Sequence, residues 1–118
     1  MTALVACLTT GKGTWGHVSR IIEEMELDQI FLITNEFGQK NFNHKKPVQF
    51  IIIDNTKQIK ELVQDIKDAI EDKICGTEVA LNLISGTGKE HMAIIAAIIQ
   101  SGLGFRLVVL TKDGVIEI

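Results

Sequence analysis

Hydroxyl side chains, glycines and one lysine stand together in the segment SGTGKE, residues 85–90, between two mostly apolar runs. Where a strand is followed by a helix, such a turn offers phosphate its backbone N–H groups, its hydroxyls and one positive charge. The spacing differs from a P-loop, because Leu83 replaces the first glycine and Glu90 replaces the Ser or Thr after the lysine. Hydrolysis of ATP by a P-loop mechanism is therefore disfavoured. The segment predicts a phosphodiester site made by Ser85, Gly86, Thr87, Gly88 and Lys89.

Three charged or titratable side chains near the expected helix starts have two interpretations each. Lys89 is either a solvated first-turn residue or a partner of an anion, and we favour the anion because a lone cation there opposes the helix dipole. His91 lies in the same helical turn, and His17 opens the first helix. Each histidine is either a capping or surface residue or a proton donor and acceptor at the site.

A second glycine turn, GKGTWG at residues 11–16, follows the first apolar segment of the chain. Its G-x-G-x-x-G spacing suits close approach of backbone N–H groups to phosphate, as in dinucleotide-binding proteins. Glu36 stands near the position where an acidic residue would bind a ribose hydroxyl. However, the chain is small for a two-half dinucleotide-binding fold, and Lys12 and Trp15 are uncommon inside such a turn. The alternative is a tight strand-to-helix turn that binds no ligand.

Alternating apolar strands and amphipathic helices predict a single α/β domain over residues 1–118. Residues 35–47 are polar and are predicted to form an irregular loop. This order indicates a Rossmann-like three-layer sandwich, with a mostly parallel sheet and a C-terminal antiparallel hairpin. If the first and fourth strands are neighbours, the two glycine turns meet at the carboxyl edge of the sheet, where such sheets bind ligands. We expect strands over residues 2–9, 29–34, 48–54, 78–85, 105–111 and 115–118, and helices over residues 17–27, 56–73 and 88–100.

The composition disfavours some classes of binding partner and some cellular locations. The formal net charge of −3 disfavours general binding to duplex nucleic acid. The sequence has neither an apolar run long enough to span a membrane nor an N-terminal signal, so we expect a cytoplasmic protein. Cys7 and Cys75 suit a reducing compartment. Because no metal-ligand spacing occurs, we expect neither a metal site nor a cofactor.

The segment MAIIAAIIQ, residues 92–100, is apolar almost all round. A helix on an open sheet needs only one apolar stripe, so something must cover its second side. We expect a second copy of the chain to cover it, which predicts a homodimer through this helix. The alternative is that other elements of the same chain cover it.

The segment SGTGKEHM and the strand before it resemble the ligand turn of the CARF domain, the CRISPR-associated Rossmann fold. Asn82 resembles the family's asparagine before that turn, shifted by one position, and Met92 sits one place later than in the commonest form. The turn TTGKGTWG is similar in position to the family's other ligand loop, and the C-terminal hairpin also fits. The resemblance spans the whole chain. It implies a homodimer that binds a cyclic oligoadenylate, the signal of type III CRISPR defence, across its twofold axis.

The resemblance also implies roles for single residues. Because no effector segment follows the hairpin, we expect a stand-alone protein that senses or buffers the signal, or a ring nuclease that cleaves it without a metal. In such cleavage the ribose 2′-hydroxyl attacks its own phosphate, and the protein positions the groups and stabilises charge. Lys89 would neutralise the phosphorane charge, and Thr9 or Thr10 would orient the reacting groups. The other expected ligand contacts are Gly11, Lys12, Gly13, Thr14, Trp15 stacked on an adenine, Asn82, Ser85, Gly86, Thr87, Gly88 and His91.

Two other interpretations stay open. The first is a small Rossmann-like module for a mononucleotide or dinucleotide, with Glu36 on a ribose, which binding of NAD would identify. The second is an interaction protein whose glycines only make turns. In that case, replacing Lys89 would leave every interaction unchanged.

Overall fold

The computed structural model describes residues 2–118, and of Lys12 only the backbone. Its strands are β1 (Ala3–Leu8), β2 (Gln29–Thr34), β3 (Gln49–Ile52), β4 (Glu78–Asn82), β5 (Gly104–Thr111) and β6 (Gly114–Glu117). Its helices are the 3-10 turn η1 (Lys12–Thr14) and the α-helices α1 (Trp15–Glu24), α2 (Glu36–Asn41), α3 (Ile59–Ile70) and α4 (Gly88–Gln100). None of the helices described is long and apolar enough to cross a membrane.

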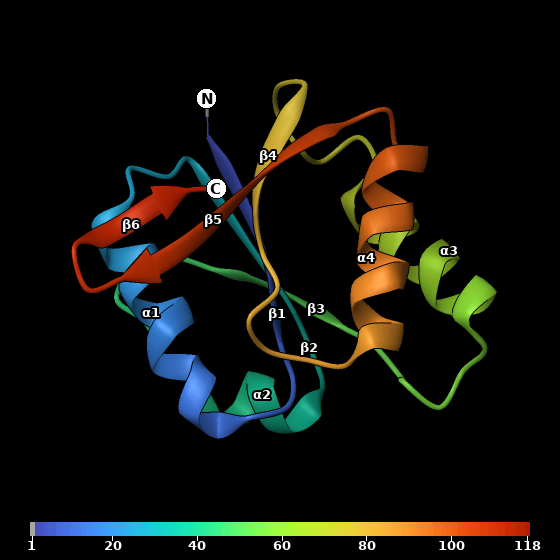
Figure 1. Ribbon diagram of the computed structural model, residues 1–118. Helices are drawn as coiled ribbons and strands as arrows, with labels where there is room; N and C mark the ends of the chain where they lie inside the picture. The colour runs from blue at the N-terminus through green and yellow to red at the C-terminus, as the bar shows by residue number, and fades with distance from the viewer. Residues whose placement is uncertain (1) are drawn as a thin grey trace.

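The described strands form one sheet in the order β3-β2-β1-β4-β5-β6 (Figure 1). Neighbouring strands from β3 to β5 are parallel, and β6 pairs antiparallel with β5. The predicted Rossmann-like α/β fold with a C-terminal antiparallel hairpin is therefore confirmed. The strand order reverses between β1 and β4, which are direct neighbours, so the connections after these two strands start side by side at the carboxyl edge.

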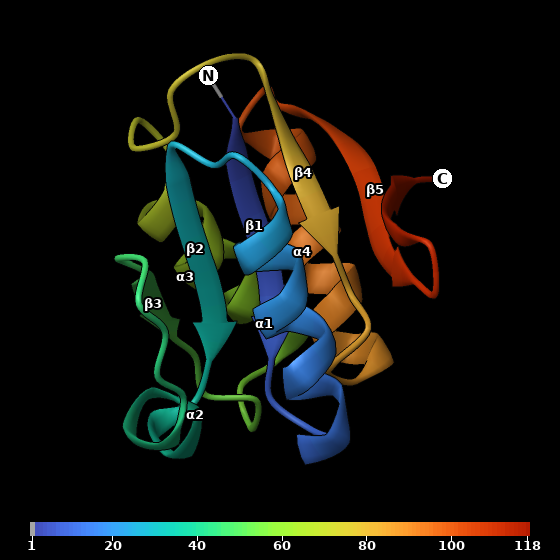
Figure 2. The ribbon, with the colours of Figure 1, turned by 90° about the vertical axis from the view of Figure 1, so that its left-hand side faces the viewer.

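Helices cover both faces of the sheet, as Figures 1 and 2 show: α1 lies on one face, and α3 and α4 lie together on the other. Successive residues of β1 alternate between two cores. Val5 and Cys7 pack in the core beneath α3 and α4, whereas Leu4, Ala6 and Leu8 pack beneath α1. Because both faces are covered, β1 is apolar at every position, which explains the run ALVACL.

The segment 35–47, predicted to be irregular, contains the helix α2, so that prediction is wrong. The helix begins after Asn35, whose side chain accepts a hydrogen bond from the Gly38 N–H at 2.9 Å. Gly38 packs so closely on the end of β2 that a Cβ atom there would lie 1.8 Å from Thr34 Oγ1. A helix of six mostly polar residues has too little apolar periodicity to be recognised, and only its asparagine cap signals it.

In three further elements a boundary differs from the prediction by three residues. The strand predicted to reach residue 85 ends at Asn82, and the first helix runs over Trp15–Glu24 rather than over residues 17–27. The helix predicted over residues 56–73 is shorter, because Asp54 and Thr56 form a turn before it. Asp54 Oδ1 accepts hydrogen bonds from the Thr56 N–H at 3.0 Å and from its hydroxyl at 2.6 Å. Asp54 therefore closes this turn, and α3 begins only at Ile59.

Candidate functional site

The two glycine turns meet at the carboxyl edge of the sheet and are hydrogen-bonded to each other. The Thr9 N–H donates to Ser85 Oγ at 3.1 Å, and the Ser85 hydroxyl donates to the Thr10 carbonyl at 2.6 Å. Ser85 is buried, while Thr10 is exposed. The expected convergence of the turns is therefore confirmed. Because both contacts involve the Ser85 hydroxyl, this group holds the two turns together inside the protein.

Glu90 is the residue of this junction that the sequence analysis left without a role. Its Oε1 accepts hydrogen bonds from the Thr9 hydroxyl at 2.7 Å and from the Thr87 N–H at 2.9 Å. In return the Glu90 N–H donates to Thr87 Oγ1 at 3.2 Å, which completes a capping box. A buried carboxylate thus interacts favourably with the N-terminal end of α4. The spacing T-x-x-E in TGKE is the signal that could have found it.

The first glycine turn is closed by its own residues. Gly11 has a φ of +71°, and its carbonyl accepts hydrogen bonds from both the N–H and the hydroxyl of Thr14. Trp15 is only 8% exposed, and its ring lies 5.9 Å from that of Phe37 and 6.2 Å from that of Phe42. The Trp15 ring therefore packs in the core and offers no open face to an adenine, contrary to the expectation from the resemblance.

Lys89 is exposed on the first turn of α4 and leans toward the loop between β3 and α3. Its Nζ donates a hydrogen bond to the carbonyl oxygen of Asn55 at 2.8 Å. A single exposed hydrogen bond of this kind is worth about 1 kcal/mol, so the side chain can leave it for a stronger partner. Lys89 lies at the carboxyl edge, and its side chain is hydrogen-bonded to Asn55 rather than to Thr9 or Thr10.

The turn before α4 is packed tightly around Gly86. Gly86 has a φ of +108°, and a Cβ atom there would lie 2.6 Å from Cys7 Sγ and 3.0 Å from His91 Nε2. The His91 ring closes the turn by donating from Nε2 to the Ser85 carbonyl at 2.7 Å. Burial raises the pKa of Cys7 to about 12, so this thiol is protonated at neutral pH. Gly86 and His91 therefore shape the turn.

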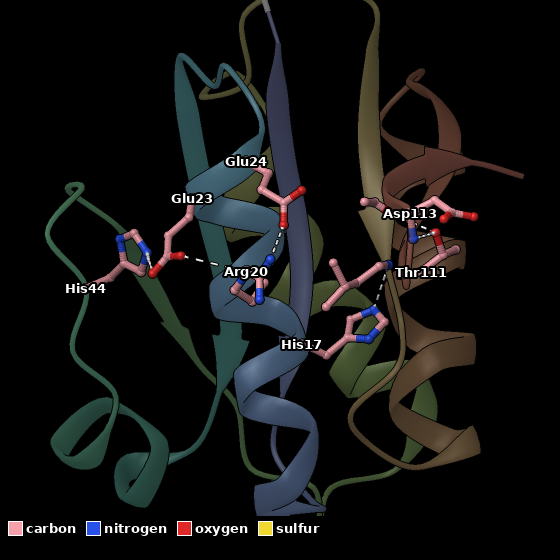
Figure 3. A network of polar contacts seen from close by, with 9 residues as sticks. His17, Arg20, Glu23, Glu24, His44, Thr111 and Asp113 are labelled. Carbon is pink, nitrogen blue, oxygen red and sulfur yellow. Dashed lines mark hydrogen bonds and ion pairs between the residues drawn. The ribbon is translucent and has the colours of Figure 1, made fainter.

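His17 and Asn82 lie on the α1 side of the same edge and join it to β5. Figure 3 shows His17 pointing from α1 toward the end of β5, where its Nε2 accepts a hydrogen bond from the Leu110 N–H at 3.2 Å. Asn82 is buried and donates to the Val108 carbonyl at 2.8 Å. Burial lowers the pKa of His17 below its ordinary 6.5, which keeps Nε2 unprotonated and able to accept. The amide of Asn82 is thus held by β5 rather than open to a ligand.

A pocket of about 520 Å³ opens beside the glycine turns, at the carboxyl ends of β2 and β3. It is where the structure places Glu36, the predicted ribose partner. Glu90 also lines it and so connects the pocket to the glycine turns. The sequence does not predict this pocket, because its lining residues come from four separate segments of the chain. The residues that line the pocket include Asn35, Glu36, Phe37, Asp54, Asp65 and Glu90.

The carboxyl edge therefore has two parts. The glycine turns bring Thr9, Thr10, Ser85, Thr87 and Glu90 together, and the pocket beside them gathers carboxylates around Glu36. Within residues 2–118, no three or more His, Cys, Asp or Glu side chains are arranged to hold a metal ion. No protein-family model and no curated protein sequence matches the chain.

Proposed function

We propose that the chain binds a cyclic oligoadenylate at the carboxyl edge of its sheet, across the twofold axis of a homodimer. The observation that carries the proposal is the direct bonding of the two glycine turns, from the Thr9 N–H to Ser85 Oγ at 3.1 Å. This bonding joins both turns into one edge on which Thr10, Gly11 and Gly88 are exposed. Phosphate oxygens accept hydrogen bonds from backbone N–H groups and hydroxyls, and an edge of this kind presents both.

The first turn of α4 supplies donors for this ligand. The first N–H groups of a helix have no acceptor within the helix. The Glu90 N–H is bonded to Thr87 Oγ1, and the His91 N–H to the Thr87 carbonyl at 2.9 Å. The N–H groups of Gly88 and Lys89 are then the ones left for a phosphate oxygen. Lys89 adds a positive charge at the same place.

The exposed apolar residues on the outer face of α4 support the proposal that a second subunit binds there. Met92 and Ile99 are 64% and 60% exposed, and they lie on one side of the helix with the half-buried Ile95. Exposed large apolar side chains that share one helix face are typical of a surface that packs on a partner. In the proposed dimer this face meets the same face of a second copy, which brings the two carboxyl edges around one axis.

The proposal extends to cleavage of the bound ring by attack of a ribose 2′-hydroxyl on its own phosphate. The new bond joins the 2′-oxygen to phosphorus, and the bond from phosphorus to the 5′-oxygen breaks. The 2′-hydroxyl gives its proton to solvent, and the leaving 5′-oxygen takes a proton from solvent. Lys89 would stabilise the negative charge that develops on the phosphate. Thr10 is exposed and is better available than Thr9, whose hydroxyl is bound to Glu90.

Calorimetric titration with cyclic tetra-adenylate and cyclic hexa-adenylate, followed by chromatography of the incubated samples, tests this proposal. We expect one ring for two chains, and an affinity about tenfold lower in Lys89→Ala because one charged contact to phosphate is lost. Lys60→Ala, which removes an exposed lysine of α3, is the matched control and should bind like the unchanged protein. Linear products would identify a ring nuclease, and an intact ring would identify a sensor or buffer. If neither ring bound, the proposal would be wrong.

The runner-up function is a mononucleotide- or dinucleotide-binding module, favoured by the position of Glu36 in the wall of the pocket. The charges argue against it, because three more carboxylates, those of Asp54, Asp65 and Glu90, line the same pocket and repel phosphate. Titration with NAD and with AMP decides between the two functions. Binding of NAD that is lost in Glu36→Ala, together with no binding of either cyclic oligoadenylate, would favour the runner-up.

A further inference from the structure

A second pocket, called here the His44 pocket, lies between α1 and the segment that follows α2. The helix contributes Ser19 and Glu23, and the segment contributes Asn43, His44 and Lys45. Figure 3 shows His44 and Glu23 pointing toward one another from these two elements. The volume of about 450 Å³ falls in the range of roughly 300–1,000 Å³ that is usual for small-molecule sites. None of these residues lines the acidic pocket at the carboxyl ends of β2 and β3.

The ring of His44 is held in a fixed orientation. It stacks on the ring of Phe42, with the centroids 6.5 Å apart and the planes inclined by 12°. Its Nδ1 accepts a hydrogen bond from the Lys46 N–H at 3.1 Å. The Lys46 side chain in turn donates from Nζ to the carbonyls of Ile22 and Met25 at the end of α1. The segment that carries His44 is therefore fixed to α1, and the pocket is formed before any ligand binds.

The other ring nitrogen of His44 is a buried donor without an acceptor. Since Nδ1 accepts a hydrogen bond, the ring proton lies on Nε2. The side chain is 6% exposed, and its Nε2 has no hydrogen-bond partner among the residues that the structure describes. Glu23 Oε1 faces it from 3.9 Å, which is beyond hydrogen-bond distance. A buried donor without an acceptor destabilises the folded protein, so a ligand that brings an acceptor to Nε2 gains affinity.

A metal ion does not fit this arrangement. A metal would need the lone pair of His44 Nε2, and the ring proton would then lie on Nδ1, toward which the Lys46 N–H already points. Within the described part of the chain, no three or more acidic, histidine or cysteine side chains are arranged to hold a metal. The chemistry of the His44 pocket therefore suits an organic molecule with an acceptor for Nε2.

The charges of the wall match a ligand that carries both signs. Glu23 and Lys45 bring one carboxylate and one ammonium group to the pocket, and both side chains are exposed. Glu23 also lies 4.0 Å from Arg20 Nε, but an exposed ion pair at this distance is weak and leaves the carboxylate available to a ligand. In an α-amino acid the ammonium and carboxylate groups stand on one carbon atom. They can therefore meet Glu23 and His44 together across the 3.9 Å between Oε1 and Nε2.

We propose that the His44 pocket binds a free α-amino acid with a small or polar side chain. The ligand carboxylate accepts the hydrogen bond from His44 Nε2 and pairs with Lys45, and the ligand ammonium group pairs with Glu23. Ser19 and Asn43 are the polar groups that face the ligand side chain, which explains why a large apolar side chain is not expected. The site shares no residue with the proposed oligoadenylate edge and does not depend on that function.

Thermal denaturation of the full chain with each standard L-amino acid, followed by calorimetric titration with those that raise the midpoint, tests the site. A ligand that binds only the folded state raises this midpoint. We expect one amino acid with a small or polar side chain to bind per chain. Its N-acetyl derivative lacks the ammonium group and should bind about tenfold more weakly. The proposal is wrong if none of the L-amino acids binds, or if the N-acetyl derivative binds equally well.

Two substitutions of His44 distinguish its two ring nitrogens. His44→Asn keeps an acceptor near the position of Nδ1 for the Lys46 N–H but removes the donor at Nε2, whereas His44→Gln can place an amide N–H near Nε2. We expect an affinity about tenfold lower in His44→Asn and a smaller loss in His44→Gln. Equal losses in two variants that urea denaturation shows to be folded would contradict a contact between the ligand and Nε2.

Substitutions at the exposed charges of the pocket keep the test independent of the buried ring. Lys45→Met and Glu23→Gln each remove one charged contact, so we expect an affinity about tenfold lower in each. Lys60→Met and Glu26→Gln are the matched controls, because they remove the same charges from exposed residues outside the pocket. Controls that weaken binding as much as the pocket variants would overturn the site. None of these outcomes bears on oligoadenylate binding, which is measured separately with the cyclic ligands.

Discussion

The glycine-turn junction and the acidic pocket share one edge of the sheet but use their polar groups in opposite ways. At the junction, the Ser85 hydroxyl bonds to the other turn, and Thr87 and His91 hydrogen-bond within their own turn. In the pocket, the Glu36 and Asp54 side chains are exposed and line open space. The difference teaches that glycines and hydroxyls typical of ligand loops are also the residues that hold two loops together. Ligand donors at the junction must then come mainly from the backbone.

Among the substitutions that distinguish the two regions, Gly86→Ala is expected to lower the free energy of unfolding most. The added Cβ meets Cys7 Sγ at 2.6 Å, and the backbone has a φ of +108°, so the variant combines overpacking with backbone strain. We expect the free energy of unfolding to fall by about 3 kcal/mol, measured by urea denaturation. Gly88→Ala is the control in the same turn, because nothing lies within 4 Å of its added Cβ. A Gly86→Ala protein as stable as Gly88→Ala would contradict the tight packing of the junction.

A smaller effect is expected at Glu90, the residue that both regions share. Glu90→Ala removes the capping box and the acceptor for the Thr9 hydroxyl, and it should lower the free energy of unfolding by about 2 kcal/mol. Glu90→Gln retains an acceptor oxygen and should recover most of this loss. If Gln failed to restore stability, charge rather than hydrogen bonding would hold the junction.

The smallest effect is a pH dependence from His17. Its pKa is lowered in the folded protein, so the unfolded state binds more protons as the pH falls. The stability contributed by neutral His17 is therefore complete above the unfolded pKa of 6.5 and is lost as the pH falls below that value. Urea midpoints measured on both sides of this pH should show the loss, and His17→Gln, which cannot titrate, should lack that part of it. Identical pH profiles for the two proteins would contradict the role of Nε2 as an acceptor.

The sequence predicts the parallel sheet and its layers well, because each strand and each long helix has a clear apolar pattern. The run ALVACL is apolar at every position since both of its faces are covered. The helix α2 was missed because its few polar residues are fixed by a tertiary contact, the packing of Gly38 on Thr34. Such a contact leaves no periodic signal in the chain.

The candidate site was predicted only in its location. The glycine spacing of GKGTWG and SGTGKE places both turns at one edge, but it does not show which way a side chain turns. Trp15 packs in the core with Phe37, and Asn82 is held by β5. The acidic pocket depends on carboxylates that lie far apart in the chain, such as Glu36 and Glu90. Only the fold brings these residues together.

An amide-resolved NMR titration with cyclic tetra-adenylate tests the central claim most directly, because it reports on both regions at once. We expect the largest shifts at the amides of residues 9–14 and 85–89, with smaller shifts along the outer face of α4. Shifts confined to the pocket residues Asn35, Glu36 and Asn55, or no shifts at all, would contradict an oligoadenylate site at the glycine turns.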